Sequence, residues 1–252
     1  MVLESLLDPV FGFVLVWPPW LGVLFISFVL TLITTVVYKY TTNQSEMKRL
    51  KEETKMYQKK MKELKNNPKK AMEVQKQAMS VNMEYMKHSF RPMIYTMLPL
   101  LIIFGWLNAY YNYDPILPNT PFNVSVITQE LEGKEVTLEA YPEMKLLSEA
   151  KQTVIREAAQ WTIQGEKGDY KLVFKQNGNT AEKRIIITDK LKYENPVSAF
   201  KNNPVKQAVI HQKELKPLGN LNILGWYPGW IGIYIIASIA FGSLLRKVMK
   251  VY

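Results

Sequence analysis

The sequence of 252 residues contains no cysteine and only two histidines, His88 and His211. Without cysteine the chain has no disulfide, no thiolate nucleophile and no cysteine-based metal site. Because the two histidines stand far apart in the sequence, we expect no histidine-based metal cluster. Motifs for phosphate binding or nucleophilic catalysis are absent as well. We therefore expect neither an enzyme nor a protein with a cofactor or a resident metal.

Charged residues are absent from three long apolar windows, residues 20–38, 93–111 and 225–245, although the mean hydropathy of the whole chain is only -0.10. A helix rises about 1.5 Å per residue, so each window reaches roughly 28–32 Å, close to the ~30 Å hydrocarbon core of a bilayer. We predict three transmembrane helices over these ranges. Because the windows hold no Asp, Glu, Lys, Arg or His, a proton relay and a cation channel lined by acidic residues are disfavoured.

Basic residues gather on one side of these windows. Residues 39–91 contain 14 Lys and Arg against 6 Asp and Glu, whereas residues 112–224 hold 15 against 14. Lysine and arginine next to membrane spans favour the cytoplasmic side. We predict a multi-pass plasma membrane protein with residues 1–19 outside at the interface, 39–92 inside, 112–224 outside and 246–252 inside.

Two helical repeats occupy the basic segment, interrupted by Asn66-Asn67-Pro68. The first follows heptad spacing through Met47, Leu50, Thr54, Tyr57, Met61 and Leu64, and the second comprises Met72, Met79, Met83, Met86 and Phe90. Proline disfavours helix at the residue before it. The two segments are therefore predicted to fold back on each other as an antiparallel coiled-coil hairpin.

Methionine is concentrated in this hairpin, because eight of the chain's 12 methionines lie between residues 47 and 93. Its flexible, polarizable side chain suits a surface that accommodates many apolar shapes. Two interpretations are open: an adaptable surface beneath the bilayer, or an ordinary coiled-coil core. The basic face has three: contact with ribosomal RNA, contact with anionic lipid, or a signal of orientation alone.

Most polar side chains within the predicted spans are small and hydroxylated. Ser27, Thr31, Thr34 and Thr35 share one helical stripe of the first span, and Thr96, Asn108 and Ser238 lie in the other two. Such residues either permit close packing of helices or line a hydrated groove between them. The sequence leaves both interpretations open.

Residues 112–224 are long enough for one small domain and alternate as β-strands do. Strands are predicted at residues 122–128, 135–140, 160–164, 170–175 and 183–188. The pair Asn177-Gly178 predicts a tight hairpin turn between the last two. Residues 146–159 are compatible with a helix or a strand, and residues 193–224 are predicted to be an extended connection. The predicted result is a small β-sandwich.

The order of these elements resembles the archaeal YidC-like membrane proteins of the YidC/Oxa/Alb insertase superfamily. The resemblance rests on Asn67-Pro68-Lys69-Lys70, the segment from Met79 to Pro92, Pro99, Gly229-Trp230-Ile231-Gly232 and Leu244-Leu245-Arg246-Lys247. It covers residues 20–112 and 225–252, while the outer domain lies outside the superfamily's shared core. It implies an α-helical membrane protein with a three-span core, a cytoplasmic antiparallel coiled-coil hairpin and an inserted, mostly β extracytoplasmic domain.

The resemblance further implies an insertase or chaperone that guides hydrophobic segments from the cytoplasm into the bilayer through a polar groove. Its groove candidates are Ser27, Thr31, Thr34, Thr35, Thr96, Asn108 and Ser238, and its substrate-capture candidates are Met72, Met79, Met83 and Met86. Several superfamily members carry a basic residue inside the groove; the predicted spans contain none, and Arg91 at the inner edge is the nearest substitute.

The partners expected on this resemblance are membrane lipid, hydrophobic segments of nascent membrane proteins, the ribosome and other translocation components. A second interpretation belongs to a different class. In it the helices only anchor a structural or receptor-like protein, which binds a partner through its extracytoplasmic β domain. An insertase is expected to contact nascent chains through the hairpin, whereas a receptor is expected to depend on residues 120–215.

Overall fold

The computed structural model describes residues 2–64, 67–129, 131–222 and 225–251. The chain forms two compact units. A helical unit comprises residues 20–105 and 231–252, and a second unit, built mainly on β-strands, comprises residues 1–19 and 106–230.

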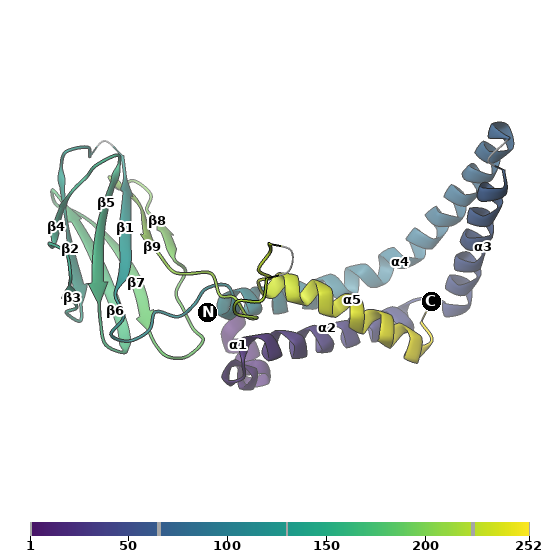
Figure 1. The fold of residues 1–252 in the computed structure, drawn as a ribbon, viewed down its shortest axis with the longest axis horizontal. Coiled ribbons are helices and arrows are strands. Elements are labelled where there is room, and N and C mark those ends of the chain that lie inside the picture. Colours follow the sequence, from purple (N-terminus) through teal and green to yellow (C-terminus); the bar gives the residue numbers. More distant parts are fainter. Residues whose placement is uncertain (1, 65–66, 130, 223–224, 252) are drawn as a thin grey trace. The chain divides into compact units, whose positions relative to one another are not determined.

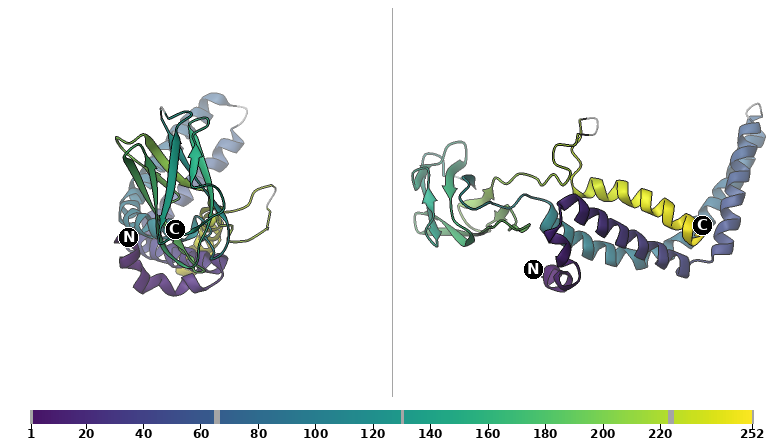
Figure 2. Two further views of the ribbon diagram at one scale, coloured as in Figure 1. Left: turned by 90° about the vertical axis from the view of Figure 1, so that its left-hand side faces the viewer. Right: turned by 60° about the horizontal axis from the view of Figure 1, so that its bottom comes forward.

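Three helices are long and apolar enough to cross a membrane: α2 (Pro19–Thr41), α4 (Pro68–Tyr111) and α5 (Trp230–Met249). Within the helical unit, α2, the second half of α4 and α5 run side by side (Figures 1 and 2). Pro19 occupies the first helical position of α2, where its missing N–H costs no hydrogen bond. The prediction of three apolar helices of bilayer length is confirmed.

The third of these helices, α5, differs from the predicted range 225–245 at both ends. Residues 225–229 are not helical, because Pro228 disfavours helix at the residue before it and Gly225 adopts a φ of 87°. At its other end α5 continues through Arg246 and Lys247, whose positive charges complement the negative C-terminal end of a helix. Arg246 therefore belongs to the helix itself.

The second apolar helix, α4, is a single helix of 44 residues that joins the hairpin to the predicted span without interruption. The change from hairpin to membrane span at residue 92 stays a prediction; the helix itself runs through that position and contains both Pro92 and Pro99. Each proline removes one N–H donor and leaves the carbonyl four residues earlier without its usual partner. The helix persists because the remaining backbone bonds on both sides stay intact.

The hairpin pairs α3 (Gln44–Glu63) with the first half of α4, which runs in the opposite direction (Figure 1). Met47 and Leu50 of α3 and Ala78 of α4 are buried. Farther along, the Thr54 hydroxyl donates to the side-chain oxygen of Asn82 over 3.4 Å. The two helices are antiparallel neighbours, and the coiled-coil hairpin stays a prediction.

The face of α4 that packs on α3 is not its methionine face. The inward positions are buried or half-buried and follow 3-4 spacing: Ala71, Val74, Ala78, Val81 and Tyr85. In contrast, the side chains of Met72, Met79, Met83 and Met86 are 50–62% exposed. The predicted second repeat is therefore not the packing seam, because small and β-branched side chains one position away fill it instead.

The β unit contains two antiparallel sheets (Figure 1), ordered β3-β5-β1-β9-β8 and β4-β2-β6-β7. Their strands are β1 (Phe122–Thr128), β2 (Glu135–Tyr141), β3 (Lys145–Leu146), β4 (Lys151–Thr153), β5 (Ala158–Gln164), β6 (Gly168–Gln176), β7 (Asn179–Ile187), β8 (Val197–Ala199) and β9 (Val205–Ile210). Alternate residues of each strand face a shared apolar core. At its centre the rings of Trp161 and Phe174 lie 5.6 Å apart, and the Trp161 indole donates to the carbonyl of Ala150 over 3.0 Å.

The five predicted strands are all present, and β1 has the predicted bounds. Asn177 and Gly178 form the turn between β6 and β7 with φ values of 44° and 82°. Residues 146–159 hold the end of β3, all of β4 and the start of β5, which settles that segment as strands.

The predicted extended connection over residues 193–224 is wrong in its first part. It contains β8 and β9, and β9 pairs with β1 inside the five-stranded sheet. Asn202, Asn203 and Pro204 lie at the turn between β8 and β9. The segment therefore completes the sandwich.

The N-terminal segment forms α1 (Val2–Phe11) and a short 3-10 helix, η1 (Gly12–Val16). Asp8 fixes α1 to the end of α4. Its carboxylate accepts hydrogen bonds from the Trp106 indole over 2.8 Å and from the Tyr110 hydroxyl over 2.9 and 3.0 Å. Membrane contact by this segment stays a prediction.

Candidate functional site

A groove of about 500 Å³ lies between α2, α4 and α5 in the helical unit. Its lining consists of Thr31, Thr34, Thr35, Tyr38, Ser89, Pro92, Met93, Thr96, Tyr234, Ser238, Ile239, Gly242, Ser243 and Arg246. Nine of these side chains carry a hydroxyl, and no described carboxylate lines the groove. Three helices that are otherwise apolar therefore enclose a polar space.

The α2 side of the groove is built from threonines at helical spacing. The hydroxyls of Thr34 and Thr35 donate to the carbonyl of Thr31 over 3.0 and 2.7 Å, and the Thr31 hydroxyl donates to the carbonyl of Ser27 over 2.6 Å. A hydroxyl has one proton but two lone pairs. With its proton used inside the helix, each oxygen can still accept a hydrogen bond from water or a peptide N–H.

The α4 and α5 sides repeat this arrangement. Thr96 donates to the carbonyl of Met93 over 3.1 Å, and Ser238 donates to the carbonyl of Ile235 over 2.9 Å. Pro92 also lines the groove, where it leaves a backbone carbonyl of α4 without its helical donor. The walls are therefore rich in hydrogen-bond acceptors.

One positive charge lies at this acceptor-rich surface. Arg246 of α5 lines the groove, and its guanidinium lies 5.4 Å from the centre of the Tyr38 ring, within the range of a cation–π interaction. Sequence reasoning missed Arg246, because it was counted as part of the basic tail after the predicted end of the span. Leu244-Leu245-Arg246-Lys247 on an apolar helical pattern was the available signal that α5 continues.

The structure brings together most, but not all, of the predicted groove residues. Thr31, Thr34, Thr35, Thr96 and Ser238 line the groove. Ser27 does not, because it is fully buried and its hydroxyl donates to the carbonyl of Val23 over 2.7 Å.

Asn108 and Arg91 also lie outside the groove lining. Asn108 belongs to the other unit, where its carbonyl accepts a hydrogen bond from the Tyr193 hydroxyl. Arg91 is exposed on α4. Arg246 therefore takes the place that sequence reasoning gave to Arg91.

The exposed methionines form a continuous track along α4, which we call the methionine stripe. Its members are Met72, Met79, Met83, Met86, Phe90, Met93 and Met97, each 50–62% exposed. At about 100° per residue their positions fall within roughly 80° of arc on the helix. Because Met93 also lines the groove, the stripe leads from the hairpin to the edge of the groove.

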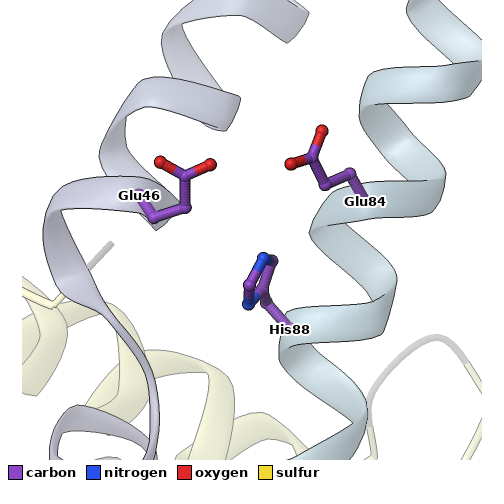
Figure 3. Close-up of side chains that lie close together, drawn as sticks. All are labelled: Glu46, Glu84 and His88. Atoms are coloured by element: carbon purple, nitrogen blue, oxygen red, sulfur yellow. The ribbon is translucent and has the colours of Figure 1, made fainter.

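A cluster of charged side chains joins α3 and α4 at the base of the hairpin. Figure 3 shows Glu46 of α3 facing Glu84 and His88 of α4, with one potential ligand atom of each within 4.8 Å of the others. The Arg49 guanidinium already pairs with Glu46 at 2.5 Å and with Glu84 at 3.6 Å. Its hydrogen bond holds the pKa of the Glu46 carboxyl below the ordinary value. We assign the cluster to holding the two helices together.

These features define a class: an α-helical membrane protein whose three apolar helices surround a hydroxyl-lined groove and whose hairpin exposes methionine. The model of one family, described as integral membrane protein EMC3/TMCO1-like, matches residues 4–147, more than half of the chain. The chain belongs to this family, which is part of the Oxa1/YidC/Alb3 insertase superfamily. No curated protein and no solved structure gives a significant match.

The matched range ends at residue 147 and includes α2, α3, α4 and the first strands of the sandwich. It places the chain in a membrane and supports an insertase-related role. Affiliation with the archaeal YidC-like branch, the plasma membrane as location and the orientation of the spans stay predictions from the sequence.

Proposed function

We propose that this protein is a membrane insertase, not an enzyme, that guides hydrophobic segments from the cytoplasm into the bilayer through the groove between α2, α4 and α5. The observation that carries the proposal is the groove itself: nine hydroxyls and Arg246 lie between helices long enough to span a membrane. A polar space of this kind has no role in simple anchoring, which apolar helices provide alone.

The groove lowers the cost of moving polar groups through hydrocarbon. An unsatisfied backbone group costs several kcal/mol in the bilayer core. Hydroxyl oxygens whose protons are already donated within their helices offer acceptors for the N–H groups of an incoming segment or for its water. The Arg246 guanidinium adds attraction for an acidic tail. In this proposal the incoming hydrophobic segment loses its bound water gradually as it passes through the groove.

The methionine stripe supplies the route to the groove. Its side chains are exposed on the face of α4 that does not pack on α3, so they are available to an apolar segment. The observed geometry favours the adaptable-surface interpretation of the methionines over the core-filler one. In this proposal the stripe captures the segment and passes it along α4 to Met93 at the groove edge.

Orientation and partners follow from the charge pattern. With the basic hairpin in the cytoplasm, the stripe would meet nascent chains as they leave the ribosome, and the β-sandwich would lie on the opposite side. The proposed partners are lipid, nascent hydrophobic segments, the ribosome and other translocation components.

The test is photocrosslinking from the stripe. A photoreactive residue at position 83 or 97 is expected to crosslink to a stalled nascent chain bearing one hydrophobic segment. Replacing Met72, Met79, Met83 and Met86 with serine is expected to reduce crosslinking from position 97 severalfold, since about 0.8 kcal/mol is lost per CH₂ group no longer buried.

The matched control is Met56→Ser, which changes an exposed methionine of α3 that lies off the stripe. Crosslinking should survive this change. Unchanged crosslinking in the quadruple variant would remove the capture role of the stripe. Deletion of residues 112–224 distinguishes the insertase from the receptor interpretation. An insertase should still crosslink to the nascent chain at the hairpin without the sandwich, whereas a receptor depends on the sandwich.

A further inference from the structure

Two Asn-X-Ser sequences, the acceptor motif for N-linked glycans, occur in the chain at residues 43–45 and 123–125. In the first, Asn43 is the N-cap of α3. Its Oδ1 accepts hydrogen bonds from the N–H groups of Ser45 and Glu46 and from the Ser45 hydroxyl. This motif therefore serves the start of a helix, in a segment predicted to face the cytoplasm.

The second motif lies on β1, where Asn123 and Ser125 share the outer face because alternate residues of a strand point the same way. Asn123 is exposed, and its Oδ1 accepts a hydrogen bond from the Thr162 hydroxyl over 2.8 Å. Its Nδ2 donates to no described residue, and the Ser125 hydroxyl lies 2.9 Å from His211 Nε2. The structure therefore leaves the amide nitrogen, the atom that would carry a sugar, available on an exposed surface.

The outer face of the five-stranded sheet around Asn123 presents amide, hydroxyl and apolar side chains. One row of directly opposed residues crosses β5, β1, β9 and β8 as Gln160, Ser125, Val209 and Val197. The neighbouring row, which contains Ile127, is uncharged as well, and Ile127 and Val197 are 41% and 44% exposed. These two rows therefore form an exposed surface without ionic side chains.

The outer face of the four-stranded sheet differs in kind. It carries three ion pairs: Lys175 with Glu139, Lys171 with Glu182 and Lys151 with Glu135. Charged side chains keep that face hydrated, whereas the face around Asn123 has amides and hydroxyls beside exposed apolar groups. A glycan is bulky and solubilising, so it would supply the hydration that the uncharged face lacks.

We propose that Asn123 carries an N-linked glycan, which covers the outer face of the five-stranded sheet. The inference depends on the predicted orientation, with the sandwich outside, because such acceptor motifs are used on secreted parts of proteins. On the folded sheet, sugar hydroxyls can hydrogen-bond with neighbouring side chains such as Gln160 and Thr162. The glycan then shields Ile127 and Val197 from contact with other chains.

The attachment is a displacement on a glycan carried by a polyisoprenyl phosphate or pyrophosphate. Nδ2 of Asn123 attacks C1 of the first sugar, and the Nδ2–C1 bond forms as the bond from C1 to the phosphate oxygen breaks. The lipid phosphate leaves with the bonding electrons, and one amide proton passes to a base of the transferring enzyme. No group is oxidised or reduced.

The test is mass spectrometry of the intact chain, purified from the membranes of its own cells. We expect a mass above that of the polypeptide by at least one sugar residue, with fragmentation placing the addition on Asn123. Asn123→Gln and Ser125→Ala should each lose the added mass. Ser125→Thr should retain it, because either hydroxyl residue completes the motif.

The matched control is Asn43→Asp, which destroys the other motif and keeps an oxygen for the cap of α3. It should leave the added mass unchanged. Both test residues lie on the surface strand face, and a change at either one tests the site if the other disturbs folding. An addition that survives Asn123→Gln would overturn the assignment.

A second measurement separates the glycan from the orientation on which it depends. Because the chain has no cysteine, a single introduced cysteine reports sidedness. In intact cells a membrane-impermeant maleimide should label Lys151→Cys, on the outer face of the four-stranded sheet, and should not label Lys59→Cys, exposed on α3. Labelling of Lys151→Cys together with an unmodified mass would overturn the glycan alone. Absence of that labelling would overturn the orientation and the glycan with it.

Discussion

Arg246 determines which kinds of polar group the groove can attract. Its guanidinium lies in the last turn of α5, 5.4 Å from the centre of the Tyr38 ring and beside hydroxyls that accept hydrogen bonds, and no described carboxylate lines the groove. Arginine stacks on aromatic rings and keeps its charge at every physiological pH. The groove therefore carries a fixed positive charge at one end.

Removing this charge should affect clients with acidic tails most. At an effective dielectric constant of ~20, two charges about 8 Å apart attract by roughly 2 kcal/mol, and partial hydration leaves about half of that, or about fivefold in rate. We expect Arg246→Gln to slow insertion of an acidic-tailed client about fivefold and a neutral-tailed client little, measured by protease protection in proteoliposomes. Lys247→Ala, next on the helix but outside the groove, is the control. Equal slowing of both clients would contradict this role.

Lys183 should make the stability of the β-sandwich depend on pH. It is 3% exposed, and burial lowers the pKa of its ammonium to about 8 from the ordinary 10.5, while its Nζ donates to the carbonyl of Asn195 and to the Ser198 hydroxyl. Between these two pKa values the unfolded chain binds more protons than the folded one, so stability rises with pH. Scanning calorimetry should show that the unfolding temperature of the wild-type sandwich rises, relative to that of Lys183→Met, as the pH increases from 8 to 10. A constant difference would contradict the lowered pKa.

For single residues, the sequence predicted which side chains are polar and share a helix face better than it predicted which other helices they contact. Thr31 and Thr35 could be placed on one face because helical spacing requires it. Whether Ser27 on the same stripe faced the groove could not be read, because burial depends on where α5 passes. Gly242, whose added Cβ would lie 3.6 Å from the Thr31 methyl, marks that close approach.

Among the elements, the β6–β7 hairpin shows most directly how local sequence sets structure. Gly178 has a φ of 82°, in the left-handed region that glycine adopts without strain, and nothing lies within 4 Å of an added Cβ. Conformation rather than space therefore requires glycine there. Asn177, at a φ of 44°, is among the few residues that tolerate this region.

Gly178→Ala is expected to destabilise the sandwich by about 1–2 kcal/mol, the cost of a left-handed conformation for a residue with a Cβ. The measurement is the midpoint of denaturant unfolding of the sandwich in the full chain. Gly229→Ala is a suitable control, because an added Cβ there meets nothing within 4 Å and its φ lies outside the left-handed region. Equal stability of Gly178→Ala and the wild type would contradict the turn assignment.

Sequence reasoning found the elements that carry a full pattern of their own, such as the alternation of β1 and the long uncharged runs of the apolar helices. It did not predict that the hairpin helix and the second apolar helix are continuous, because the apolar window was delimited by charge, which does not show whether a helix ends there. It missed β8 and β9, because three and six residues between turn signals are too short for a clear alternation. The methionine repeat was detected, but its assignment to the seam failed because α4 has two apolar stripes one position apart.

For the whole molecule, membership of the EMC3/TMCO1-like family rests on the first two apolar helices, the hairpin and the start of the sandwich. The third apolar helix supplies Arg246 and four further groove residues with hydroxyl or glycine side chains, outside the matched range. The groove therefore requires all three helices. Function is expected to be lost when α5 is removed, even though the family-matched part stays intact.

Insertion into liposomes of known composition tests most directly whether the groove carries hydrophobic segments into the bilayer. The purified chain is reconstituted, and a single-span client with a short translocated tail is synthesised in its presence. Protease protection of the client is expected to rise severalfold above empty liposomes, and to fall back when Thr31, Thr35 and Ser238 are replaced with valine, because the acceptors of the groove are lost. Protection no greater than with empty liposomes would contradict an insertase role for the groove.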